Sequence, residues 1–199
     1  FTSQSLTVEQ ARTSLQYLRA SLERYPAGFF ARTGVPEIRI GRDLQVIDHP
    51  FFPGQDQGAI SGLTMPDRNE ILLELSVDSG FARFMSTFDH ELYHWLDAKR
   101  PNRSRNDAEW VAMHQACECR PYSNYVNGEV VSAPGSERPN LGIWFFDTYG
   151  SRTPMEDKAT MANVIFSPAD HLQFLQRLED IRDVVGDQEA YESLRARYD

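Results

Sequence analysis

Apolar residues recur at helical spacing in two long stretches of the first hundred residues. In residues 7–25 they lie three and four positions apart, and Thr7 with Gln10 forms a capping-box pattern. This stretch predicts a scaffold helix that packs on a sheet through Val8, Ala11, Leu15, Leu18 and Leu22. The second stretch, residues 80–99, predicts a helix that is buried along Phe84, Phe88, Leu92, Trp95 and Leu96.

Between these two helices the apolar residues follow the period of two that is typical of strands. Residues 37–40 alternate cleanly, and residues 44–47 are a possible continuation. Residues 58–64 and 70–75 are two further strand-like runs, and the turn sequence between them predicts a hairpin. The hairpin directly precedes the second helix, so its edge strand is a candidate site for an extended peptide.

The second half of the chain is predicted to be mainly helical. Asn106 caps one expected helix, and Thr153 with Pro154 begins another. The fold class is therefore α+β, with a small mixed or antiparallel sheet packed on a central helix. We expect a single domain, residues 1–199, with a lobe of residues 1–100 that contains the sheet and a helical lobe of residues 101–199.

Composition and charge limit the classes of partner. The chain has 199 residues, 41% of them hydrophobic and 12% aromatic, as expected of a globular protein. Its formal net charge of −9 argues against nucleic acid and anionic membranes, which bind basic surfaces. A protein or peptide substrate fits better, and a monomer is expected. No apolar run approaches the roughly 20 residues that cross a bilayer. The first residue is Phe1, which indicates a processed or trimmed chain and favours a secreted protein.

Residues 90–94 read HELYH, which matches the pattern His-Glu-x-x-His. Residues four apart on a helix lie one above the other, so His90 and His94 can bind one zinc ion from the same face. Glu91 projects about 100° further round the helix, where it can act as a general base. The alternative is a core helix whose histidines are satisfied by hydrogen bonds.

Catalytic zinc needs a third protein ligand, and Glu156 is the best candidate. It would project from the first turn of the helix that Thr153 caps. In the alternative interpretation, Thr153 and Glu156 form a capping box and the carboxylate serves only its own helix. Tyr149 lies seven residues before Glu156, where its phenol can donate to a developing oxyanion.

The His-Glu-x-x-His motif followed by Tyr-x6-Glu resembles the gluzincin arrangement of the anthrax lethal factor catalytic domain and the secreted bacterial Pro-Pro endopeptidases. The motif Glu-Asp-x-Ala, which follows the tyrosine, also resembles the sequence of bacterial zinc-binding metallopeptidases. The resemblance implies a zincin-like fold and a zinc-dependent endopeptidase. By this resemblance His90, His94 and Glu156 bind Zn²⁺, Glu91 is the base and Tyr149 stabilises the oxyanion.

Two other functions stay open at the level of the sequence. One is a non-catalytic, metal-stabilised binding protein, in which a fourth protein ligand such as Asp107 or His114 closes the site. The other is a zinc hydrolase that acts on a non-peptide amide.

Overall fold

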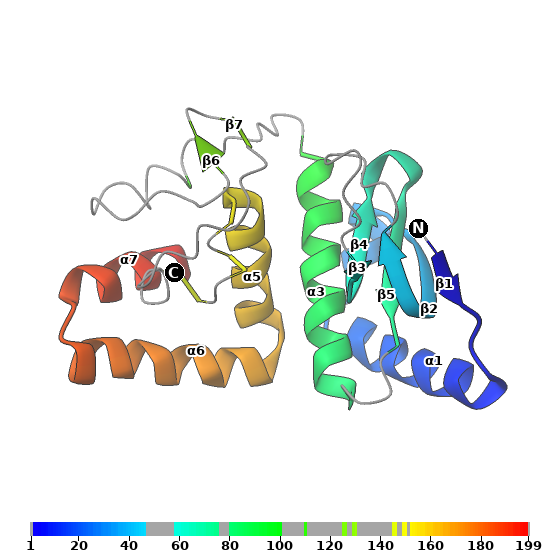
Figure 1. The fold of residues 1–199 in the computed structure, drawn as a ribbon, viewed down its shortest axis with the longest axis horizontal. Helices are drawn as coiled ribbons and strands as arrows, with labels where there is room; N and C mark the ends of the chain where they lie inside the picture. Colours follow the sequence, from blue (N-terminus) through cyan, green and yellow to red (C-terminus); the bar gives the residue numbers. More distant parts are fainter. Residues whose placement is uncertain are drawn as a thin grey trace. The chain divides into compact units, whose positions relative to one another are not determined.

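The chain folds as two compact units, Phe1–Lys99 and Arg100–Asp199 (Figure 1). The structure is a computed structural model, and it describes residues 2–46, 58–75, 80–100, 110, 125–126, 129–130, 145–146, 149–150 and 152–198. Most of the helix predicted from Asn106, including Asp107 and His114, lies outside these residues.

The first unit is built on a mixed sheet of five strands. Four of them lie in the order β1 (Thr2–Gln4), β2 (Glu37–Val46), β5 (Glu70–Glu74) and β4 (Gly62–Met65), and the short β3 (Gly58–Ala59) also pairs with β2. Strands β2 and β5 are parallel, and the other pairs are antiparallel. The predicted hairpin is confirmed as β4 and β5, joined by the 3-10 turn Pro66–Arg68. Its predicted first strand, residues 58–64, is divided into β3, which pairs with β2, and β4. Residues 44–46 of the possible continuation also belong to β2, and residue 47 lies outside the described residues.

Helix α3 (Gly80–Ala98) packs along β4 and β5 (Figure 1). The predicted apolar stripe is confirmed, because Phe88 and Trp95 are fully buried, and complete burial of a side chain such as Phe88 contributes about 1.5–3 kcal/mol. The core of this unit consists of Tyr25, Ile71, Leu73, Leu75, Phe84, Phe88, Leu92 and Trp95. The sheet therefore holds the helix that carries the His-Glu-x-x-His motif.

Helix α1 (Val8–Leu22) begins with the predicted capping box, and Leu18 and Leu22 of the predicted face pack against the core of the unit. Val8 and Leu15 are 78% and 64% exposed, so the prediction that they face the core is wrong. The helix packs on α3 through Tyr17, whose ring lies 5.2 Å from that of Phe81 and 5.7 Å from that of Phe84. Ser14 and Ser21 are buried. Each hydroxyl donates to a carbonyl of its own helix, so neither is buried without a hydrogen-bond partner.

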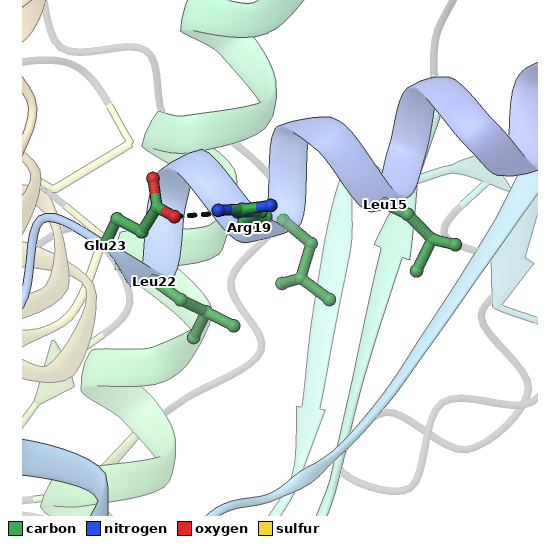
Figure 2. A pocket seen from close by; sticks show the side chains of 5 residues that line it. Leu15, Arg19, Leu22 and Glu23 are labelled. Atoms are coloured by element: carbon green, nitrogen blue, oxygen red, sulfur yellow. Dashed lines mark hydrogen bonds and ion pairs between the residues drawn. The ribbon is translucent and has the colours of Figure 1, made fainter.

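One side of α1, which includes Leu15 and Leu22, lines a shallow hollow (Figure 2). Leu15 and Leu22 project beside an ion pair between Arg19 and Glu23, whose side chains are mostly exposed. Ion pairs of this kind contribute about 0–1 kcal/mol. The hollow contains none of the residues that the sequence assigns to the metal site. The short helix α2 (Phe29–Thr33) follows α1.

The second unit is mostly helical in the part that the structure describes, as predicted. Helix α5 (Pro154–Phe166) packs on α6 (Pro168–Asp180), which continues into a π-helical turn (Ile181–Val185) before α7 (Gln188–Tyr198). Two short strands, β6 (Tyr125–Val126) and β7 (Glu129–Val130), form a separate hairpin. The helices enclose a core of Phe146, Met161, Val164, Phe174, Leu178, Ile181, Ala190 and Leu194. Among the described residues, no helix is both long and apolar enough to cross a membrane.

Candidate metal centre

The two histidines of the motif lie one turn apart on α3, as their spacing predicts. The Nε2 atom of His90 lies 3.1 Å from the Nε2 atom of His94, and the rings are nearly perpendicular. Two nitrogens bound to one tetrahedral zinc ion at about 2.0–2.1 Å would lie about 3.3 Å apart. The observed separation is close to this value, so the pair fits a shared metal ion. One N–H···N hydrogen bond between neutral rings would give a similar distance.

Asp89, next to His90, fixes α3 to the end of α1. Its fully buried carboxylate accepts hydrogen bonds to both oxygens from Arg24 Nη2 at 2.8 Å, and one from the Tyr25 hydroxyl at 2.7 Å. Burial raises the pKa of the Tyr25 phenol well above its ordinary value, and the Asp89 charge adds to this effect. The phenol therefore stays a donor. Removing one partner of such a buried pair costs about 3–5 kcal/mol, so the pair holds this part of α3 firmly.

Trp95 provides a second anchor, one turn after Glu91. Its side chain is fully buried and its Nε1 donates to Asn69 Oδ1 at 3.0 Å, in the turn between β4 and β5. Asn69 has a positive φ of 56°, which asparagine tolerates better than most residues. The motif therefore lies on a helix that is anchored on both sides.

Glu91 lies on the side of α3 that faces β4, and only 8% of its surface is exposed. The Thr64 hydroxyl lies 2.7 Å from Glu91 Oε2 and 2.7 Å from the Glu91 carbonyl oxygen. It has a single hydrogen, so it donates to one of these oxygens at a time. A Cβ at Gly62 would lie 2.7 Å from Glu91 Cγ and 2.9 Å from Glu91 Oε1. The carboxylate thus fills space that any other residue at position 62 would occupy.

Glu156 lies in the first turn of α5, as predicted. Thr153 is the N-cap, its hydroxyl accepts from the Glu156 backbone N–H at 3.2 Å, and Pro154 is the first helical residue. Glu156 is half-buried. The next residue, Asp157, is fully buried and accepts a hydrogen bond from Trp110 Nε1 at 2.9 Å, which fixes this turn.

The described residues include one group of histidine and carboxylate side chains with the composition of a metal site. They are His90 and His94 in the first unit and Glu156 in the second, and each offers one ligand atom. Two imidazole nitrogens and one carboxylate oxygen are a donor set that suits zinc and leaves a fourth position for solvent. The donor set fits the ion, and metal binding by this group stays a prediction.

Tyr149 precedes α5, and 42% of its surface is exposed. Its carbonyl accepts from the Arg152 backbone N–H at 3.1 Å, and the Arg152 guanidinium lies 4.5 Å from the centre of its ring. This cation–π contact orients the ring from one face. The role of its hydroxyl toward an oxyanion stays a prediction.

The sequence did not single out Thr64 as a residue of the site. Its only signal is the period of two in the predicted hairpin, which puts Thr64 and Gly62 on one face of a strand just before the motif helix. Asp89 and its partner Arg24 are also new, because nothing local links residues that are 65 positions apart.

Comparison of the chain with protein-family models, with curated proteins and with solved structures found no match. The interpretation of the site therefore depends on its own residues.

Proposed function

We propose that this protein is a zinc-dependent endopeptidase with a zincin-like arrangement of its site. The observation that carries the proposal is the pair of ring nitrogens of His90 and His94, 3.1 Å apart on α3, together with a carboxylate, Glu91, that directly follows the first ligand. With Glu156 as the predicted third ligand, this combination supplies three ligands and a separate base, as an open catalytic site requires.

When bound there, zinc lowers the pKa of a coordinated water toward about 7 and polarises a carbonyl. Glu91 accepts the proton of the attacking water, and it later delivers this proton to the nitrogen of the leaving amine. The burial of Glu91 and its contact with Thr64 support this role, because a base must be held within hydrogen-bond reach of the proton it takes.

Strand β4 supports a peptide as the substrate. Among the described strands its only neighbour is β5, so its other edge offers backbone N–H and C=O groups to an extended chain. Glu91 lies directly against this strand, beside Gly62 and Thr64. A peptide paired along β4 would run past the proposed base.

Tyr149 is the proposed donor to the oxyanion. Tyr149→Phe removes one hydroxyl and keeps the ring and its contact with Arg152. We expect kcat to fall by about 100-fold, the typical loss for one oxyanion donor, while zinc content stays the same. Steady-state kinetics and metal analysis of both proteins measure this, and normal turnover by the variant would remove Tyr149 from the site.

The experiment that tests the function is digestion of a mixed peptide library, with mass spectrometry of the products. We expect internal peptide bonds to be cleaved, cleavage to stop with a chelator and to return when Zn²⁺ is added back. Stoichiometric zinc without cleavage would favour a metal-stabilised binding protein. Release of amines from small non-peptide amides alone would identify the other kind of zinc hydrolase.

A further inference from the structure

Strand β4 contacts the side chain of Glu91 at two positions, and both contacts suit a residue whose carboxylate must be held in place. We infer that Thr64 and Gly62 are positioning residues for Glu91. This inference rests on the proposed function, because a fixed carboxylate matters for turnover only if Glu91 is the base.

The geometry of the strand explains why these two residues act together. Side chains two positions apart on a strand lie on the same face, so Gly62 and Thr64 both face α3. Gly62 leaves the volume that the Glu91 side chain fills, and the methyl group of Thr87 borders the same space at 2.8 Å from the position of an added Cβ. Glycine therefore admits the carboxylate, and a larger residue would exclude it.

Thr64 limits the positions that the Glu91 carboxylate can take in the space beside Gly62. Its hydroxyl lies at hydrogen-bond distance from both the carboxylate and the backbone carbonyl of the same residue. A hydroxyl that can donate to either oxygen stays close to both of them, and while it donates to the carboxylate it limits the rotations of the side chain. A free glutamate loses rotamer entropy when it is fixed. In the folded protein this ordering is already in place before a substrate binds.

The test replaces the hydroxyl without changing the size of the side chain. Thr64→Val removes the donor, Thr64→Ser restores it, and Thr2→Val on the exposed strand β1 is the matched control. We expect Thr64→Val to lower kcat by about 10- to 100-fold, as is usual when a supporting hydrogen bond is lost. KM and zinc content should stay at the wild-type values, Thr64→Ser should recover most of kcat, and Thr2→Val should change nothing.

Gly62→Ala tests the same inference through the contact between Gly62 and Glu91. It also provides a test if Thr64→Val does not fold. An added Cβ would lie within 3 Å of Glu91 Cγ and Oε1, so we expect Glu91 to shift and kcat again to fall with zinc retained. Normal kcat in either folded variant would overturn the inference. An equal loss in Thr64→Ser would also overturn it, because the hydroxyl would then not be the cause.

A structural measurement separates this inference from the proposed function. In crystals of Thr64→Val, we expect the Glu91 carboxylate to move or to lose order relative to the wild-type protein. An unchanged carboxylate would overturn the inference even if the wild-type protein hydrolyses no peptide. Absence of zinc-dependent hydrolysis by the wild-type protein, with Glu91 displaced in the variant, would overturn only the proposed function.

Discussion

Glu91→Gln is expected to lower kcat by about 10³-fold, within the range that a general base contributes, while the protein keeps its zinc. Glutamine has the shape of glutamate and its amide oxygen can still accept from Thr64, so the site should keep its structure. It cannot take a proton from water at neutral pH. The measurement is kcat and KM on one cleaved peptide, with zinc content determined on the same samples.

The matched control for this variant is Glu179→Gln, at an exposed position of α6. It makes the same chemical change and should leave kcat unaltered. Turnover by Glu91→Gln at the wild-type rate would exclude Glu91 as the base and, with it, the proposed mechanism.

Glu156→Ala is expected to weaken zinc binding by more than about 100-fold, the upper end of what loss of a supporting residue around a metal costs. Two imidazoles alone do not hold catalytic zinc. The start of α5 should survive, because Thr153 accepts from the backbone N–H of residue 156, which alanine keeps. Competition with a chelating dye measures the zinc dissociation constant, and thermal unfolding of the metal-free protein measures stability.

Glu189→Ala is the matched control, since Glu189 also lies in the first turn of a helix of the same unit. It should bind zinc as the wild-type protein does. If the Glu156 carboxylate only caps its own helix, Glu156→Ala will lower the melting temperature of the metal-free protein and leave the zinc affinity unchanged. This result would contradict the proposed ligand set.

The features that the sequence predicted well are those that depend on neighbours along the chain. The stripe of α3, the hairpin around Asn69 and the start of α5 at Thr153 follow from helical spacing, turn residues and capping. The pairing of His90 with His94 follows from the pitch of a helix. Each of these depends on steps of three or four residues along a helix or on one tight hairpin.

The features that it missed depend on contacts between distant segments. Leu15 has the spacing of a core residue, yet it is exposed, and α1 packs through Tyr17, Leu18 and Leu22. The same helix also buries Ser14 and Ser21, whose hydroxyls donate to carbonyls of the helix itself. The contact of Thr64 with Glu91 requires β4 to lie against α3, and local spacing contains no information about it.

The claim on which the rest depends is that His90, His94 and Glu156 bind one zinc ion in an open site. An anomalous difference map at the zinc absorption edge, from crystals grown with Zn²⁺, tests this most directly. We predict one peak about 2.0–2.2 Å from a ring nitrogen of each histidine and from a carboxylate oxygen of Glu156, with solvent as the remaining ligand. A peak at other residues, or one closed by a fourth protein ligand, would contradict the account.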